Sequence, residues 1–138
     1  MKRKKILVVD DDRIVLDSCK RVLEAEGYKV YLVLSAPEAI EFLETEYIDL
    51  MIMDVKMPEK DGMYLLDKIR EKWPLEYWPE LPVLVMSGYP TPGTVHDIQK
   101  RGARDFIPKP FTPDELLNAV HKALQRSHKH GKKKNPGH

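Results

Sequence analysis

The sequence predicts an α/β fold, a single doubly wound (βα)5 domain with a parallel sheet that is covered by helices on both faces. Short apolar runs, which are typical of buried strands, alternate five times with helical segments along the chain. Polar side chains suited to chemistry follow four of these runs. The length of 138 residues and the hydrophobic content of 42% suit one domain with its own core.

The first strand is predicted at residues 6–9, an unbroken apolar run that leads into Asp10, Asp11 and Asp12. Asp12 is the expected N-cap of the first helix, because its carboxylate can accept a hydrogen bond from a free backbone N–H. Gly27 is expected to end this helix. Its apolar positions recur at helical spacing and predict the buried face, made of Val15, Cys19, Val22 and Leu23.

The second and third strands are predicted at residues 28–34 and 48–53. Between them, Ser35 is a favourable N-cap for a short helix that ends near Glu46. Asp54 follows the third strand directly. A third helix is expected around residues 64–69, after a segment of turn composition.

The fourth strand is predicted at residues 81–86 and leads into Ser87. A weakly amphipathic helix around Val95 and Ile98 should end at Gly102. The fifth strand, Phe106-Ile107, runs into Lys109-Pro110. Residues 112–115 have the composition of a helix start, and the helix after them carries Leu116, Leu117, Val120 and Leu124.

Charge is unevenly distributed along the chain. Without eight basic residues near the two ends, 15 basic residues face 22 acidic ones, so the body is acidic and an unsuitable surface for DNA. We therefore expect a domain at residues 1–126, no DNA-binding domain, and a basic tail at 127–138 that is disordered. Cys19 is the only cysteine, and no segment suits a membrane span, so the expected location is the cytoplasm.

Five side chains with complementary chemistry should meet at one sheet edge, because the carboxyl ends of parallel strands lie together. Carboxylates suit Mg²⁺, which prefers oxygen ligands. Asp54 can attack a phosphoryl group as a nucleophile, while a lysine and a hydroxyl bind the oxygens of that group. These five residues are Asp10, Asp11, Asp54, Ser87 and Lys109.

Four motifs together resemble the receiver domain of two-component response regulators. The resemblance covers roughly residues 4–126 and implies a flavodoxin-like fold with five parallel strands in the order 2-1-3-4-5. It also implies a sensor histidine kinase or a phosphotransfer protein as the phosphoryl donor. The motifs are Val8-Val9-Asp10-Asp11-Asp12, Met53-Asp54-Val55-Lys56-Met57-Pro58 with Asp61-Gly62, Met86-Ser87-Gly88, and residues 102–111 around Lys109-Pro110.

By this resemblance, Asp54 is the phosphoacceptor. The ligands of Mg²⁺ (or Mn²⁺) would be Asp11 directly, Asp10 mainly through water, Asp54, and the backbone carbonyl of Lys56. The Ser87 hydroxyl would move toward the phosphoryl group. An aromatic ring at Phe106 would then turn inward.

The resemblance further implies a cis Lys109-Pro110 bond and a downstream protein target on the face of the fourth helix, fifth strand and fifth helix. The protein is expected to be a monomer, or a dimer that forms on phosphorylation. Lys56 and Tyr89 stand where family members tune the lifetime of the acyl phosphate. Both side chains are large enough to obstruct an attacking water, so we expect slow self-dephosphorylation.

Alternative functions remain open at this stage. Asp10-x-Asp12 after a strand, followed by Ser87 and Lys109, also resembles a small phosphatase of the haloacid dehalogenase type with Asp10 as nucleophile. A binding module that keeps the receiver fold without signalling is a third possibility. The chain could also be a receiver from a larger regulator or a hybrid kinase.

Overall fold

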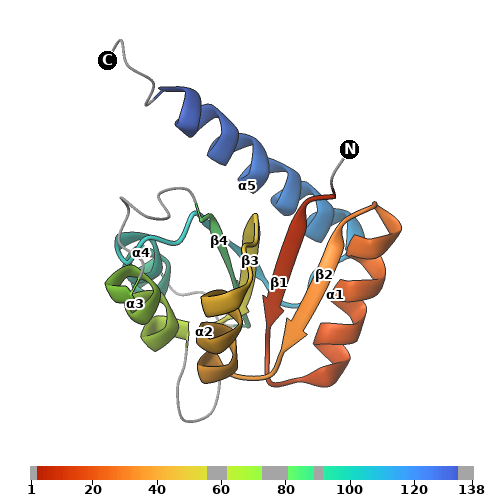
Figure 1. Ribbon diagram of the computed structural model, residues 1–138. Coiled ribbons are helices and arrows are strands. Elements are labelled where there is room, and N and C mark those ends of the chain that lie inside the picture. Colours follow the sequence, from red (N-terminus) through yellow and green to blue (C-terminus); the bar gives the residue numbers. More distant parts are fainter. Residues whose placement is uncertain (1–2, 56–61, 73–80, 89–91, 134–138) are drawn as a thin grey trace.

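The protein folds around one parallel sheet of five strands in the order β2-β1-β3-β4-β5 (Figure 1). This computed structural model describes residues 3–55, 62–72, 81–88 and 92–133. Each neighbouring pair of strands is parallel, which confirms the predicted fold class and strand order. The strands are β1 (Lys5–Val9), β2 (Lys29–Val33), β3 (Leu50–Asp54), β4 (Val83–Ser87) and β5 (Asp105–Pro108).

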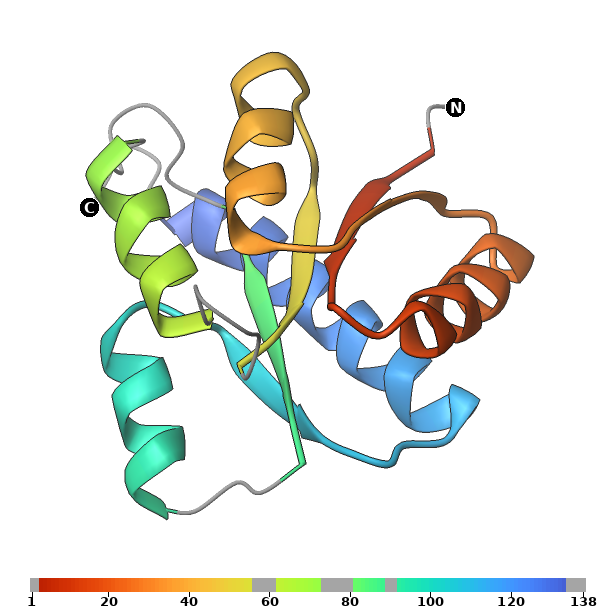
Figure 2. The same cartoon turned by 90° about the horizontal axis from the view of Figure 1, so that it is seen from below.

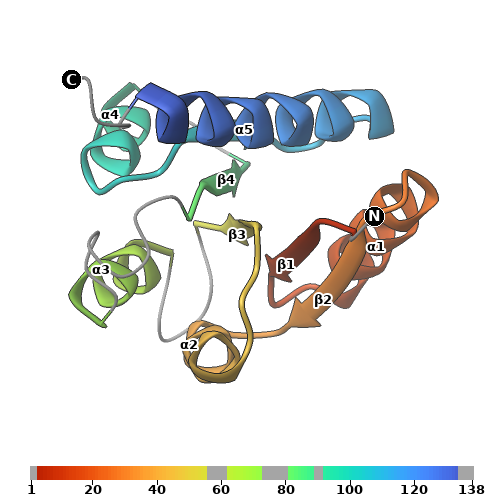
Figure 3. The same ribbon diagram turned by 45° about the horizontal axis from the view of Figure 1, so that its top comes forward.

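Helices cover both faces of the sheet, as Figures 2 and 3 show. One core cluster joins the sheet to α1 and α5, and the other joins it to α2, α3 and α4. The described helices are α1 (Arg13–Ala25), α2 (Ala36–Thr45), α3 (Gly62–Lys72), α4 (Pro92–Lys100) and α5 (Pro113–Lys133).

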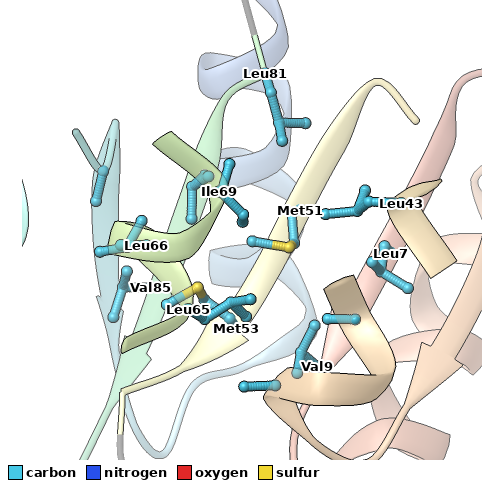
Figure 4. Packing of buried hydrophobic residues seen from close by; sticks show 14 of the residues in the cluster. Leu7, Val9, Leu43, Met51, Met53, Leu65, Leu66, Ile69, Leu81 and Val85 are labelled. Carbon is cyan, nitrogen blue, oxygen red and sulfur yellow. The ribbon is translucent and has the colours of Figure 1, made fainter. Parts of the chain in front are cut away.

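Side chains alternate between the two cores along each strand, because successive residues of a strand point to opposite faces. In β1, Ile6 and Val8 pack toward α1 and α5, whereas Leu7 and Val9 pack toward α2 and α3. Figure 4 shows the second of these cores, where methionine and leucine side chains fill the space between sheet and helices. These four residues of β1 are fully buried, which explains the unbroken apolar run in the sequence.

Local sequence signals set the helix ends where they were predicted. Asp12 is the N-cap of α1 and accepts a hydrogen bond from Ile14 N at 2.9 Å. Ser35 caps α2 in the same way. Before α5, Glu115 N donates to Thr112 Oγ1 at 3.1 Å and Thr112 N donates to Glu115 Oε1 at 2.8 Å, a reciprocal capping box.

The buried face of α1 differs in part from the prediction. Cys19 and Leu23 are buried as expected, but Leu16 is buried too, while Val15 and Val22 are only partly buried. The apolar stripe of α1 is wider than its buried face. Val15 and Val22 lie at the margin of that stripe.

Helix α5 is longer than the sequence indicates. Helix α5 continues to Lys133, past the predicted domain end at residue 126, and the expected disorder of the tail stays a prediction. Lysine is a good helix former, and cations near the carboxyl end of a helix interact favourably with its dipole, whereas Gly131 and the two histidines of this stretch favour the helix less.

Candidate functional site

Four strand ends bring the predicted site residues together at the carboxyl edge of the sheet. Asp10 follows β1, Asp54 ends β3, Ser87 ends β4, and Lys109 follows β5. Strands β1 and β3 are direct neighbours in the sheet, which brings their aspartates side by side. The described geometry therefore unites residues from four separate parts of the chain.

Lys109 binds two of the carboxylates. Its Nζ donates to Asp10 Oδ2 at 3.0 Å and to Asp54 Oδ2 at 3.1 Å. The Lys109-Pro110 bond is cis, as predicted, and Lys109 N donates to the backbone oxygen of Ser87 at 2.8 Å. A single lysine thus links the ends of β1, β3 and β4.

The three aspartates form a compact oxygen cluster. Asp10, Asp11 and Asp54 each offer a carboxylate oxygen, and these oxygens lie within 4.8 Å of one another. Asp10 and Asp54 are buried, whereas Asp11 is exposed. A set of hard oxygen donors, open to solvent on one side, fits a divalent cation that keeps some of its water. The residues present therefore fit a metal site.

Burial and charge perturb the ionisation of the site. Burial raises the pKa of Asp10 above its usual range, although hydrogen bonds from Asp12 N and Lys109 oppose this increase. Burial alone would lower the pKa of Lys109, but its hydrogen bonds to Asp10 and Asp54 raise that pKa overall. The lysine is therefore held as an ammonium ion beside the two buried carboxylates.

The two predicted switch residues lie on neighbouring strands. Ser87 is 2% exposed at the end of β4. Phe106 lies on β5, opposite Val85 in the register, and packs partly buried against the core on the α2, α3 and α4 side. The Ser87 hydroxyl therefore lies at the site. The Phe106 ring lies on the neighbouring strand, at the level of Val85, which is two residues before Ser87.

Two predicted tuning residues, Lys56 and Tyr89, lie outside the described residues, and so does the Lys56 carbonyl. Asp10 is fully buried, and both its oxygens accept hydrogen bonds, which gives the phosphatase alternative no support. None of the helices in the described ranges combines the length and apolar character that crossing a membrane requires.

A surface cleft beside Lys109 was missed by the sequence analysis. Its volume is about 520 Å³, and its wall is mostly apolar. Ile14 forms part of its wall and is 77% exposed. The spacing of apolar residues in α1 predicted one buried face and no second apolar surface. The cleft is lined by Ile14, Val15, Ser18, Gly88, Lys109, Pro110 and Phe111.

Known structures and sequences agree on the family. The chain superposes with a TM-score of 0.84 on a CheY-like response regulator receiver domain protein from Methanospirillum hungatei JF-1, at 32% identity and covering 94% of this chain and 99% of that one. NtrX from Brucella abortus gives a TM-score of 0.85 at 32% identity, with 95% of this chain and 29% of that chain covered.

Among curated sequences, the response regulator MprA of Mycobacterium ulcerans (strain Agy99) is 35% identical over 123 residues, which make up 89% of this chain and 51% of that protein. This chain thus spans about half the length of such relatives, so the expected absence of a DNA-binding domain is not supported for the whole protein. The sequence profile described as "Response regulator receiver domain" matches residues 6–121. The chain therefore belongs to the response regulator receiver domain family.

Proposed function

We propose that this protein is a phosphorylation-activated switch of a two-component system, with Asp54 as the phosphoacceptor. The observation that carries the proposal is the contact of Lys109 with both Asp54 and Asp10 at the carboxyl edge of a receiver fold. A buried carboxylate beside a fixed ammonium group and two further acids is suited to phosphoryl transfer.

Asp54 is the best placed nucleophile among the three aspartates. Asp10 is completely buried, and both its oxygens accept hydrogen bonds. Asp11 is exposed, so water solvates its carboxylate and no fixed geometry aims it at a substrate. Asp54 combines a position at the end of the central strand with a side chain that is 11% exposed, so a donor can reach it.

The proposed reaction transfers the phosphoryl group from a phosphohistidine of a sensor kinase or a phosphotransfer protein. A carboxylate oxygen of Asp54 attacks phosphorus, an O–P bond forms, and the N–P bond of the donor breaks. The bonding electron pair stays on the imidazole nitrogen, which takes up a proton. Lys109 and the Ser87 hydroxyl bind oxygens of the transferred group and so stabilise the charge that develops on it.

A divalent cation completes this site in our proposal. Asp10, Asp11, Asp54 and the backbone carbonyl of Lys56 would hold Mg²⁺ (or Mn²⁺), which supplies positive charge for the phosphoryl oxygens. Among the residues that the structure describes, one ammonium group, that of Lys109, contacts the cluster of three carboxylates. The protein's own charges thus leave a negative site that favours a cation.

The cleft beside Lys109 supports docking of the donor at this edge. Its apolar wall includes the exposed Ile14 and lies against the lysine that contacts Asp54. A donor helix that buries Ile14 would bring its phosphohistidine toward the acceptor carboxylate. The position of this apolar cleft beside the acceptor therefore favours a protein over a free metabolite as the main phosphoryl donor.

Phosphorylation is proposed to reach the downstream target through Ser87 and Phe106. A small hollow of about 280 Å³ lies between β5 and α5, and Phe106 lines it. Movement of the Ser87 hydroxyl toward the phosphoryl group would leave space for the ring, and an inward turn of the ring would change this hollow. The face of α4, β5 and α5 would then present a different surface to its target.

Lys56 and Tyr89 are proposed to set the lifetime of the acyl phosphate on Asp54. Lys56 and Tyr89 would obstruct an attacking water and give slow self-dephosphorylation. The double variant Lys56→Ala, Tyr89→Ala should lose the phosphoryl group faster than the parent. Equal or slower loss from the double variant would contradict this role.

The test of the proposed function is the intact mass of the protein after incubation with acetyl phosphate, with and without Mg²⁺. We expect wild type to gain one phosphoryl group only when Mg²⁺ is present, and Asp54→Asn to gain none. A gain that persists in Asp54→Asn would exclude Asp54 as the acceptor. The absence of any gain in wild type, despite proven Mg²⁺ binding, would favour a non-signalling module.

A further inference from the structure

Helix α5 is longer than the layer that it covers. Its 21 residues span about 32 Å at the usual helical rise, whereas a strand of five residues spans about 17 Å. Leu116, Val120 and Ala123 are buried against the sheet and α1, and no residue with a large apolar side chain follows Leu124 in this helix. Figure 1 shows the carboxyl-terminal turns of α5 extending past the end of the sheet.

This projecting segment, residues 125–133, is strongly basic. Helix α5 contains no aspartate or glutamate from Asn118 to Lys133. Over the same stretch the chain carries five permanently basic side chains, Lys122, Arg126, Lys129, Lys132 and Lys133. Cations favour the carboxyl end of a helix, but that effect falls off within the last turn and does not account for the whole stretch.

The basic segment lies far from the acidic site. Helix α5 begins after β5 at the carboxyl edge of the sheet and runs back, so the segment ends at the opposite edge (Figure 1). The molecule therefore has an acidic site at the three aspartates and, at the opposite edge of the sheet, a basic pole formed by residues 125–133.

The composition of the segment narrows the class of partner. A helix that inserts into a membrane surface or a protein groove needs apolar side chains at helical spacing, and the segment has none. A run of basic residues without acids or apolar residues in the sequence is instead suited to closely spaced phosphates. We propose that the basic segment of α5 binds the phosphate backbone of a duplex nucleic acid without sequence preference.

The acidic site at the three aspartates does not oppose this interaction at physiological ionic strength. The five-residue strands separate this site from the basic pole by about 17 Å, whereas the Debye length at physiological ionic strength is about 8 Å. Phosphates bound at the basic pole are thus screened from Asp10, Asp11 and Asp54. Nucleic-acid binding should therefore be independent of phosphorylation at Asp54.

The test measures the anisotropy of a short fluorescein-labelled DNA duplex that is titrated with the full 138-residue chain at several salt concentrations. Wild type is compared with the triple variant Lys129→Gln, Lys132→Gln, Lys133→Gln, since glutamine removes charge and retains helix propensity. Three lost phosphate contacts should weaken binding at least about tenfold at low salt and reduce the slope of log K against log salt by about three.

A matched control separates a local site from net charge. The variant Lys20→Gln, Lys29→Gln, Lys100→Gln removes the same charge from exposed positions of α1, β2 and α4. It should bind the duplex nearly as well as wild type, as should Asp54→Asn. Equal weakening in the control, or no binding by wild type at low salt, would overturn the proposal.

Vesicles of phosphatidylserine and phosphatidylcholine test the other class of polyanion. We expect the chain to bind them more weakly than the duplex at the same salt concentration. Vesicle binding at least as tight as duplex binding would overturn the assignment to nucleic acid. Asp54→Asn is used both in the acetyl phosphate test and in the duplex-binding test. A failure of nucleic-acid binding is therefore distinguishable from a failure of the proposed phosphorylation.

Discussion

Lys109 Nζ lies 3.1 Å from Asp54 Oδ2, although 55 residues separate the two in the sequence. Strand β4 stands between β3, which ends in Asp54, and β5, which precedes Lys109. The lysine therefore crosses over the end of one strand to reach the acceptor, and it reaches Asp10 on β1 as well. This contact depends on the whole sheet, and it organises the site.

Replacement of Lys109 by methionine should damage both stability and phosphorylation. The variant leaves the buried Asp10 and Asp54 side by side without the ammonium that contacts both, and removal of one partner from a buried ion pair costs roughly 3 kcal/mol at neutral pH. Urea unfolding at pH 7 measures this loss, and acetyl phosphate incorporation measures the second effect. Unchanged phosphorylation in a folded Lys109→Met protein would exclude a role for the lysine in transfer.

Replacement of Asp10 by asparagine should stabilise the protein at neutral pH in the absence of metal. Burial raises the pKa of Asp10 above 3.8, so the stability linked to its protonated form is complete below that pH and is lost as pH rises through the folded-state pKa. Asparagine is neutral at every pH, and its amide oxygen can still accept the hydrogen bond from Asp12 N. The bond from Lys109 to Asp10 is lost, but Lys109 keeps its bond to Asp54.

The advantage of Asp10→Asn over wild type should therefore be small near pH 3.8 and should grow toward pH 7, where the Tm of the variant should exceed that of wild type. Thermal unfolding of both proteins across this pH range checks the sign. An advantage for wild type at pH 7 without metal would show that Lys109 outweighs the burial of the charge.

Asp11 and Asp12 are adjacent acids with different expected roles. Asp11→Ala should abolish the stabilisation of the protein by Mg²⁺, because Asp11 is part of the oxygen cluster. Asp12→Ala should keep that stabilisation but lower the stability with and without Mg²⁺ by about 1 kcal/mol, the usual cost of losing an N-cap. Thermal unfolding over a Mg²⁺ titration distinguishes the two, and a Mg²⁺ response in Asp11→Ala would remove it from the ligand set.

Two glycines with similar backbone conformations offer a matched test of packing. Gly27 and Gly102 have φ values of 96° and 104°, so alanine at either position should cost about 1–2 kcal/mol in backbone strain. A Cβ at Gly102 would also lie 2.9 Å from Arg70 Nε, whereas nothing lies within 4 Å at Gly27. Gly102→Ala should therefore destabilise the protein more than Gly27→Ala.

Removal of the Arg70 side chain should reduce this difference. In an Arg70→Ala background, the cost of Gly102→Ala should approach that of Gly27→Ala, because the obstructing guanidinium is absent. Denaturant unfolding of the single and double variants provides the comparison. Equal costs for the two glycine variants in the wild-type background would show that Arg70 moves aside freely.

Cys19 should be unreactive in the folded protein. Burial, with a smaller contribution from nearby Asp10, raises the pKa of its thiol to about 11, so only about one thiol in a thousand is ionised at pH 8. Iodoacetamide labelling followed by mass spectrometry should show modification only in urea. Rapid labelling of the native protein at pH 8 would indicate that α1 opens often.

The sequence predicted the fold well because its signals are local. Alternating apolar runs and helical segments identified the five strands, and residues such as Asp12, Ser35 and Gly27 identified helix ends. It did not show that Leu16 is buried while Val15 lies at the margin, since periodicity defines a face only to within one residue on either side.

The end of α5 and the cleft at Ile14 were likewise outside the reach of sequence patterns. Residues 127–133 have the composition of a disordered tail, yet they extend a helix that packing against the sheet has already nucleated. Ile14 adjoins the buried face of α1 in sequence, but the segment around Pro110 makes it part of a second surface.

The sequence by itself determined which residues could do the chemistry: three aspartates, a serine and a lysine, each next to a predicted strand. Only the tertiary structure decided that these groups meet, with carboxylate oxygens within 4.8 Å of one another and Lys109 hydrogen-bonded to Asp10 and Asp54. The reason is physical. The end of a strand can be predicted from neighbouring residues in the sequence, whereas the distance between two side chains depends on sheet order, register and the packing of helices on both faces.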